Sequence, residues 1–370
     1  MPSPVSKPRR LLIVLPSWVG DAVMATPALR RIRDALPGSF IGGLCRPGID
    51  ELLAGSNLVD ELHVERGGGV FGPKLMAAKV RPRQYDAALL LTNSFATAMV
   101  TRIAGIPRRI GYNRDGRGLL LTDKLDAPKR ADGAWAIIPA CQYYWDAAGF
   151  LIDGRQTVHD TKDNQPIALA LGAGAVMELG ITDGQRTTAE VILKRVGLAG
   201  AERYAMLNPG GNNPAKRWPP ERFAALADHL AANHTLRILV NGSPAEEALV
   251  AQIVGMCKKA EPVSLPRSGI TLGALKELIR RAALLVTNDT GPRHIAAALG
   301  TPMVSLFGPT DHRWSLVPTR AGAPEVIVLA DPTLPDDLSA NDHTERCAIG
   351  RIEFATVRAA ADAVLMAARR

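Results

Sequence analysis

The feature that most constrains this chain is a series of short, continuously apolar segments that alternate with segments of helical pattern. Residues 11–15, LLIVL, form an unbroken apolar run, as expected for a strand buried on both faces of a parallel sheet. A helical pattern over residues 22–36 follows this run, is interrupted by Pro27 and ends at Pro37 and Gly38. Strands that alternate with helices over short connections are typical of an open, doubly wound α/β sheet.

The same alternation runs through both halves of the chain. In the first half we expect strands at residues 40–44 and 85–91 and helices at 49–53 and 95–104. The second half is predicted to hold strands at residues 204–207, 236–240, 284–287 and 303–307. Its expected helices are residues 220–232, 245–257, 272–281 and 294–299.

Residues 151–203 separate the two halves, because they are rich in Gly, Asp and Thr and hold one helical stretch, 188–196. A chain of 370 residues is also too long for one compact core. We therefore predict two Rossmann-like domains facing a cleft. The expected parts are a domain of residues 1–165, a connector 166–203, a second domain 204–352 and a C-terminal amphipathic helix 353–370.

The positive charge of the chain is concentrated in its first third. The formal net charge is +8, and residues 1–130 hold 20 Lys and Arg against 11 Asp and Glu, whereas the rest is nearly balanced. This asymmetry indicates an anionic partner for the first domain: a phosphorylated substrate, an acidic membrane surface or a nucleic acid. The nucleic-acid alternative is the weaker one, because aromatic residues make up only 5% of the chain and no nucleic-acid-binding motif is present.

Composition also indicates the cellular compartment of the protein and argues against a metal or cofactor site. No apolar run approaches the ~18–20 residues that span a bilayer, and the apolar stretch after Arg9 and Arg10 is too short for a signal peptide. We expect a cytoplasmic protein. The four cysteines are far apart and lack metal-ligand spacing, so we expect reduced thiols and neither a metal site nor a cofactor. They are Cys45, Cys141, Cys257 and Cys347.

The sharpest local pattern is residues 286–302, VTNDTGPRHIAAALGTP, where an expected strand runs into an expected helix. Asp289 or Thr290 can cap this helix, and Gly300 fits its end. Such a turn directs free backbone N–H groups and the positive end of the helix dipole at a sheet edge, where ligands bind in these folds. Gly291 lets an anion approach closely, and His294 can add a hydrogen bond. A well-capped helix without a ligand is the alternative.

A second polar loop, residues 207–219, also follows an expected strand and precedes a helix. Its sequence is LNPGGNNPAKRWP, in which Asn208, Gly210 and Lys216 are candidate ligand contacts. Glycines free the backbone to wrap a phosphate, and Lys216 supplies a compact positive charge. The Gly-Lys-Ser/Thr ending of a P-loop is absent, and such a cluster alone is most often a turn. Two loops of this kind at one sheet edge would, however, form a pyrophosphate clamp.

The third pattern is residues 16–22, PSWVGDA, which follows the first strand. Asp21 lies at a helix start, where an acidic residue stabilises the helix by ~0.5–2 kcal/mol. Its functional alternative is a general base. Trp18 is either a platform on which a sugar stacks or an anchor in a core or interface.

Together these patterns resemble the ADP-heptose:lipopolysaccharide heptosyltransferases, most of all the heptosyltransferase II type. The matching segments, in family order, are residues 16–21, 91–95, 104–111, 209–219, 287–294 and 307–309. The resemblance implies a two-domain glycosyltransferase of the B architecture, with the ADP-sugar donor on the C-terminal domain and the acceptor on the N-terminal one. It also implies direct displacement, with inversion at the anomeric carbon.

The resemblance further assigns roles to residues. Asp21 would take the proton from the acceptor hydroxyl. The donor site would comprise Asn208, Gly210, Lys216, Asp289, Thr290, Gly291 and His294. Acceptor contacts would come from Trp18, Arg46, Asn93, Ser94, Arg102 and Arg114. The implied acceptor is an anionic glycolipid, reached by a monomer peripheral to the cytoplasmic face of the inner membrane.

Two alternatives stay open on the sequence. A nucleotide-sugar 2-epimerase shares the two-domain architecture but would leave the WVGD turn unexplained. A non-catalytic protein that binds nucleotide sugars or anionic glycans would keep the donor loops and not need Asp21.

Overall fold

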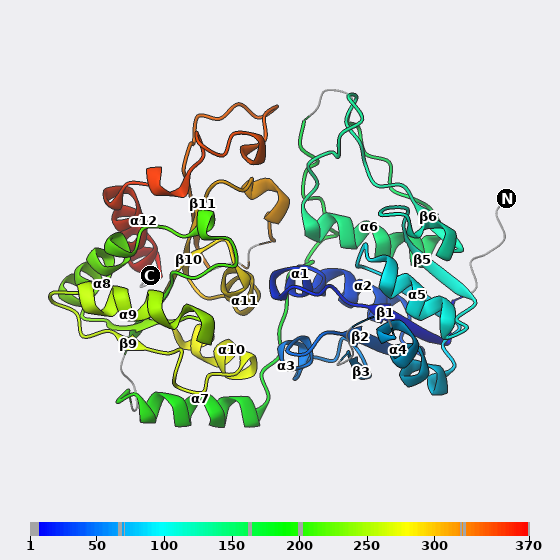
Figure 1. The fold of residues 1–370 in the computed structure, drawn as a ribbon, viewed down its shortest axis with the longest axis horizontal. Coiled ribbons are helices and arrows are strands. Elements are labelled where there is room, and N and C mark those ends of the chain that lie inside the picture. The colour runs from blue at the N-terminus through cyan, green and yellow to red at the C-terminus, as the bar shows by residue number, and fades with distance from the viewer. Residues whose placement is uncertain are drawn as a thin grey trace. The chain divides into compact units, whose positions relative to one another are not determined.

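The computed structural model describes residues 7–65, 69, 71–161, 165–198, 203–318, 320 and 323–368. The chain forms two compact units (Figure 1). Unit 1 comprises Met1–Glu178 with Arg313–Val317, and unit 2 comprises Leu179–His312 with Pro318–Arg370. Residues 199–202 of the predicted connector lie outside the described residues.

Over the residues that the structure describes, unit 1 contains one six-stranded parallel sheet with the strand order β3-β2-β1-β4-β5-β6. The strands are β1 (Arg10–Val14), β2 (Phe40–Cys45), β3 (Glu61–Val64), β4 (Ala87–Leu90), β5 (Arg108–Tyr112) and β6 (Asp123–Leu125). β1 is central, with Leu12 paired to Gly42 on one side and to Ala88 on the other. Its continuous burial confirms the predicted strand at residues 11–15.

Helices cover both faces of this sheet. They are α1 (Val19–Met24), α2 (Thr26–Ala35), α3 (Ile49–Leu53), α4 (Gly72–Val80), α5 (Phe95–Ile103) and α6 (Ala140–Asp153). The inner sides of α4 and α5 pack on alternate residues of the strands, among them Leu12, Val14 and Leu90. α2 packs against α6.

The helical pattern over residues 22–36, with its interruption near Pro27, is confirmed as two helices, α1 and α2, although α1 begins three residues earlier, at Val19. Pro27 lies in the first turn of α2, where its missing N–H costs no helical hydrogen bond. The Thr26 hydroxyl instead donates to Val23 O, 2.7 Å away, across the junction of the two helices.

Unit 2 repeats the architecture, with a second six-stranded parallel sheet in the described residues and the strand order β12-β11-β10-β7-β8-β9. The strands are β7 (Tyr204–Asn208), β8 (Arg237–Val240), β9 (Val263–Ser264), β10 (Leu284–Asn288), β11 (Met303–Phe307) and β12 (Glu325–Leu329). The helices are α7 (Asp183–Arg195), α8 (Pro220–His234), α9 (Glu247–Met256), α10 (Leu272–Arg281), α11 (Gly291–Leu299) and α12 (Phe354–Ala367).

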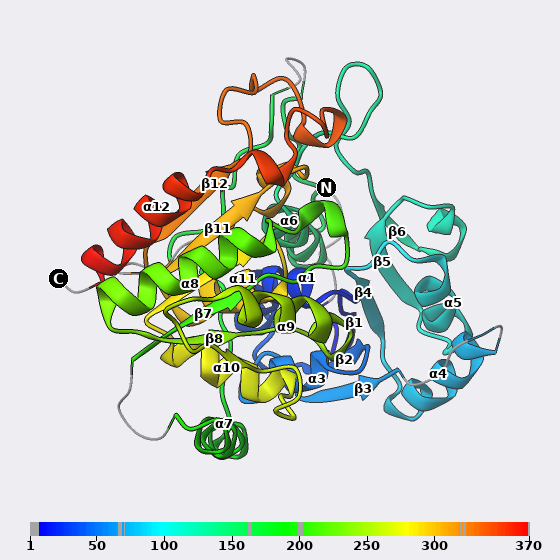
Figure 2. The same ribbon diagram turned by 60° about the vertical axis from the view of Figure 1, so that its left-hand side comes forward.

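One apolar cluster joins the second sheet to the helices on one of its faces. Helices α8, α9 and α12 contribute Phe223, Ile253 and Val357 to this cluster, and α8 and α12 lie side by side in Figure 2. The predicted C-terminal helix is therefore part of the core of unit 2. Among the described residues no helix is both long and apolar enough to cross a membrane.

Candidate active site

In unit 2 the two polar loops singled out in the sequence follow adjacent parallel strands. β7 pairs with β10, and Asn208 lies opposite Thr287 at the ends of these strands. Because the carboxyl ends of parallel strands meet at one edge of a sheet, the loops lie together at the edge where ligands bind in open α/β folds. The two loops thus share one sheet edge, which is the arrangement that a pyrophosphate clamp would need.

The two loops are joined by charge at Asp289. Lys216 Nζ lies 3.2 Å from Asp289 Oδ2, and His294 Nε2 lies 4.0 Å from Asp289 Oδ1. Burial by itself would raise the pKa of the Asp289 carboxyl, but Lys216 and the other nearby basic groups hold that pKa below its usual value. Asp289 is therefore a carboxylate at neutral pH and holds the Lys216 ammonium at the sheet edge.

His294 is a neutral imidazole in this site. Burial, reinforced by the charge of Arg293, lowers the pKa of His294 to about 3. Its side chain is buried, and within the described part of the chain Nδ1 makes no hydrogen bond. A buried ring nitrogen without a partner is costly unless a ligand supplies one.

The start of α11 matches the predicted turn in most respects. Thr290 occupies the N-cap position without a side-chain cap, Pro292 lies in the first turn, and Gly300 ends the helix with φ +77°. The Thr290 hydroxyl hydrogen-bonds instead to Asn208 Nδ2 at 3.0 Å. Thr290 thus makes no side-chain cap, Pro292 has no N–H, and the Arg293 N–H donates to Thr290 O at 3.1 Å, which leaves the Gly291 N–H for an anion at this helix start.

Arg293, which precedes His294 in the first turn of α11, turns into the core. Its side chain is fully buried, its Nε lies 2.7 Å from Glu325 Oε1, and its guanidinium lies over the Phe307 ring. This pair ties α11 to β12, so Arg293 serves packing.

Amide side chains that sequence reasoning missed support both loops. Asn288 Nδ2 donates to Pro209 O at 2.8 Å and Gly210 O at 3.1 Å, and Asn288 Oδ1 accepts from Trp218 N. Asn241 Nδ2 donates to Asn208 Oδ1 at 2.7 Å. These bonds satisfy buried polar groups and fix the loop that carries Lys216.

Glu246 is a further residue that sequence reasoning missed. Its Oε1 accepts from Gly211 N at 2.7 Å, and its Oε2 accepts from Ser243 N at 2.8 Å. A Cβ at Gly210 would lie 2.3 Å from Glu246 Oε1, so glycine is needed there to admit the carboxylate. The N–H of Gly211, which the sequence offered to a phosphate, is therefore already taken by Glu246.

In unit 1, Asp21 lies in the first turn of α1, directly after β1. The Tyr144 hydroxyl, from α6, donates to Asp21 Oδ1 at 3.3 Å. Burial, reinforced by the charge of Asp21, raises the pKa of Tyr144 well above its usual value, so this hydroxyl keeps its proton. Trp18, just before α1, is 63% exposed, so the alternative that it anchors a core is wrong.

Asn93 follows β4 at the same edge of the sheet as Asp21. Its Oδ1 accepts from Arg117 Nη2 at 2.9 Å and from Tyr143 Oη at 3.2 Å. Arg117, which sequence reasoning missed, is fully buried, and burial lowers its pKa to about 10. Arg117 and Tyr143 thereby set the orientation of the Asn93 amide.

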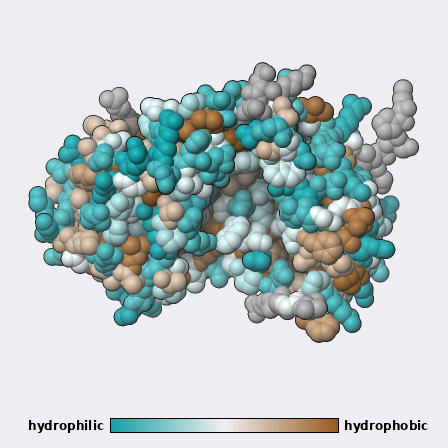
Figure 3. All heavy atoms as spheres, turned by 45° about the horizontal axis from the view of Figure 1, so that its top comes forward, coloured by the Kyte–Doolittle hydropathy of each residue, from teal (hydrophilic) through white to brown (hydrophobic). Residues whose placement is uncertain are grey.

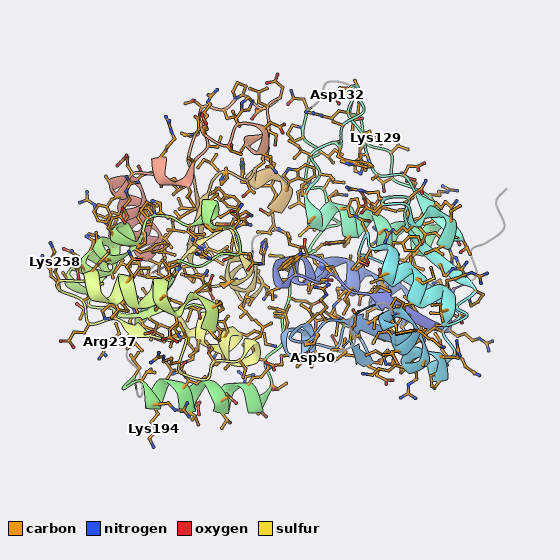
Figure 4. The ribbon with its side chains drawn as sticks, in the orientation of Figure 1. Asp50, Lys129, Asp132, Lys194, Arg237 and Lys258 are labelled. Atoms are coloured by element: carbon orange, nitrogen blue, oxygen red, sulfur yellow. The ribbon has the colours of Figure 1, made fainter. Side chains whose placement is uncertain are left out.

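The remaining acceptor candidates differ in position. Arg46 is exposed directly after β2, at the edge that holds Asp21. The Arg114 guanidinium lies 4.0 Å from the centre of the Trp135 ring, whose loop also carries Lys129 and Asp132 (Figure 4). Ser94 caps α5 by accepting from Thr97 N, and Arg102 lies in the last turn of that helix, toward the opposite sheet edge.

The sequence of this chain is similar to those of known proteins. A model of glycosyltransferase family 9 (heptosyltransferase) matches residues 75–327. The lipooligosaccharide heptosyltransferase 2 of Haemophilus ducreyi is 30% identical over 318 residues, covering 81% of this chain and 84% of that protein. The lipopolysaccharide heptosyltransferase 2 of Escherichia coli K12 is 27% identical over 308 residues, covering 81% of this chain and 83% of that protein.

Solved structures agree in fold. The ADP-heptose lipopolysaccharide heptosyltransferase II of E. coli superposes with a TM-score of 0.76 over 98% of this chain and 100% of that one, at 22% identity. A family 9 glycosyl transferase of Veillonella parvula gives 0.76 over 98% and 99%, at 20% identity. The two parallel-sheet units of this chain have the fold of glycosyltransferases of the B architecture. The chain belongs to glycosyltransferase family 9, the heptosyltransferases.

Proposed function

We propose that this protein transfers a heptose from ADP-heptose to the inner core of lipopolysaccharide, with inversion at the anomeric carbon. The names of the similar proteins support the donor and the acceptor class. The observation that carries the proposal is the 3.2 Å contact of Lys216 with Asp289 beside the uncapped start of α11.

The polar and charged groups at the sheet edge of unit 2 suit the pyrophosphate of the donor. Lys216 and the Gly291 N–H at the start of α11 would bind the diphosphate, whose negative charge grows as the bond to the sugar breaks. Asp289 holds Lys216 in place and does not itself face the phosphates, since two anions repel each other. His294 would hydrogen-bond the donor through Nδ1. Thr290, Gly291 and Asn208 would shape the surface around the diphosphate, and Gly210 leaves room for Glu246 beside it.

Glu246 suits a different part of the donor. A carboxylate repels phosphate but accepts hydrogen bonds from neutral hydroxyls. Because Glu246 lies against Gly210 and Gly211, at 2.7 Å from the Gly211 N–H, we assign it to the sugar hydroxyls of the donor.

Asp21 is the proposed general base. The Asp21 carboxylate would take the proton of the acceptor hydroxyl while the oxygen forms a bond to the anomeric carbon. The bond from that carbon to the diphosphate breaks at the same time, and its electron pair leaves with ADP. The Tyr144 hydroxyl, 3.3 Å from Oδ1, orients Asp21 for this step.

The acceptor would be an anionic glycolipid bound by unit 1. Trp18 offers an exposed ring on which a sugar can stack, and Asn93 offers an amide already fixed by Arg117. Arg46 and Arg114 would contact acidic groups of the acceptor. We leave Ser94 and Arg102 out of this set, because one caps α5 and the other lies toward the other sheet edge.

A donor screen followed by product analysis tests the proposal. Purified protein is heated with ADP-heptose, UDP-sugars and GDP-sugars, and ADP-heptose should raise the melting temperature most. NMR of the heptosylated product should then show the anomeric configuration opposite to that of the donor. Equal protection by the three nucleotides would contradict the donor assignment, and a retained configuration would contradict direct displacement.

A further inference from the structure

Helix α4 is apolar on two faces, although only one of them packs against the rest of unit 1. Met76, Ala77 and Val80 are buried against the sheet. The opposite face carries a second apolar stripe at helical spacing. It consists of Phe71 just before the helix, Leu75, Ala78 and Pro82, all exposed. Phe71 is 72% exposed and Leu75 is 60% exposed, so most of the surface of these two apolar side chains faces solvent.

The neighbouring elements also carry exposed apolar side chains. α5 packs against α4, and Phe95 at its start is 47% exposed. Leu119, in a turn packed against α5, is 93% exposed. Hydrophobic side chains reach the surface on the α4 side of unit 1 at the lower right of Figure 3. We call this set, Phe71, Leu75, Phe95 and Leu119, the α4–α5 face.

The sequence around this face is strongly basic. Residues 66–114 hold nine Lys and Arg but a single acidic residue, Asp86. Lys74 stands beside Leu75 on α4, and within the described residues it makes no ion pair. Exposed Phe and Leu bordered by Lys and Arg are the features of a segment that lies in the interface of an anionic bilayer.

Two residues of the α4–α5 face lie toward the same edge of the first sheet as the proposed base. α4 follows β3 and α5 follows β4, so Phe71 and Phe95 lie toward the carboxyl edge of the first sheet. Asp21 follows β1 at that same edge. A bilayer on the α4–α5 face would therefore bring lipid-anchored acceptors to the edge that carries the proposed base.

We propose that the α4–α5 face docks unit 1 on an anionic lipid bilayer, with Phe71 and Leu75 entering the headgroup region and Lys74 contacting lipid phosphates. The proposal rests on the proposed function only in placing the acceptor on that bilayer. A protein partner would be expected to offer acidic side chains to the basic rim, and a second copy of this basic surface would repel the first.

Vesicle sedimentation tests the docking without donor or acceptor. The full-length protein is mixed with vesicles of phosphatidylcholine alone or with added phosphatidylglycerol, at low and high salt. We expect partitioning onto the anionic vesicles only, weakened by salt. The double variant Phe71→Ser, Leu75→Ser should lower partitioning at least about tenfold, and Lys74→Gln about fivefold.

A matched control removes exposed apolar side chains from unit 2. Val191 on α7 is 51% exposed and Met366 on α12 is 61% exposed, so Val191→Ser, Met366→Ser should leave partitioning unchanged. Equal binding of the wild type and the Phe71, Leu75 variant to anionic vesicles would overturn the proposal. So would a wild type that self-associates in gel filtration and dissociates only in that variant, since the face would then join two copies.

The docking proposal and the proposed function can fail independently of each other. Transfer to a detergent-dispersed acceptor without vesicle binding would overturn the docking and leave heptosyl transfer standing. Vesicle binding without transfer from any ADP-sugar would overturn heptosyl transfer and leave the docking standing.

Discussion

Lys216 Nζ lies 3.2 Å from Asp289 Oδ2, which joins two loops 73 residues apart in the sequence. The pair is largely buried, with side-chain exposures of 24% and 14%. Since the strands before the two loops are adjacent, a single charge contact fixes the spacing between Lys216 and the start of α11. This relationship makes the loops one binding surface.

Replacement of Lys216 should weaken donor binding. In Lys216→Met the diphosphate loses its ammonium, and we expect kcat/KM to fall about 10- to 100-fold, as for a lost charge-assisted hydrogen bond. Asp289→Asn should lower kcat/KM less, because Lys216 remains. If Asp289 acts through Lys216, the losses in the double variant will not add. Titration calorimetry with ADP checks the binding, and unchanged ADP affinity in Lys216→Met would contradict the assignment.

Replacement of Asp21 should separate chemistry from binding. Asp21→Asn keeps the size of the side chain but cannot take a proton, so transfer should fall about 10²- to 10⁴-fold. The rise in melting temperature with ADP-heptose should be unchanged. Asp34→Asn is the control, because Asp34 is an exposed carboxylate of α2 in the same unit. Transfer by Asp21→Asn at the wild-type rate would rule out Asp21 as the base.

Gly210 should not tolerate alanine. The added Cβ would meet Glu246 Oε1 at 2.3 Å, so Gly210→Ala should destabilise the fold by about 1–3 kcal/mol in urea unfolding. Gly255→Ala is a contrasting control, because Gly255 lies in α9 with nothing within 4 Å, and alanine should stabilise the helix by ~0.5–1 kcal/mol. Combination of Gly210→Ala with Glu246→Ala should recover part of the loss, and no recovery would contradict the steric explanation.

The C-terminal helix should carry a pH-dependent contribution to stability. His229 Nε2 and His234 Nε2, from α8, lie 2.8 and 2.6 Å from Asp362 Oδ1 on α12. Burial alone would raise the pKa of Asp362, but the hydrogen bonds and charges of the two histidines bring that pKa below its usual value. A carboxyl with a lowered folded-state pKa stabilises the fold above its unfolded pKa and loses this contribution as the pH falls through the folded one.

Thermal unfolding of Asp362→Asn between pH 3 and pH 7 checks this prediction. The variant should be less stable than the wild type by ~1–2 kcal/mol at pH 7, and the difference should shrink toward pH 3. A difference that is constant with pH would show that the carboxylate charge plays no part.

Strongly patterned elements were predictable from the sequence. The structure confirms the predicted helices 49–53 and 272–281 and the predicted strand 303–307 at the same bounds. α7 was predicted at 188–196 but begins at Asp183, because Thr182 and Gln185 form a capping box whose spacing is readable in the sequence.

Other elements were missed for physical reasons. α6 is buried around most of its circumference, so its apolar residues show no single-face periodicity. β5 begins with Arg108 and Arg109, and the edge strands β3 and β12 include charged or half-buried residues. The spacing of His229 and His234 revealed no partner, because Asp362 reaches them from another helix.

The alternation of strand and helix, and the polar loops that end two strands of the second sheet, could be predicted from local sequence alone. These features depend on local periodicity and turn chemistry, which neighbouring residues decide. Three features emerged from the folded chain instead: which loops share a sheet edge, the position of Glu246 beside Gly210, and the opposite directions of Arg293, toward the core, and His294, toward Asp289. Strand order and side-chain direction depend on packing between distant segments, and a linear pattern does not encode which of those segments will meet.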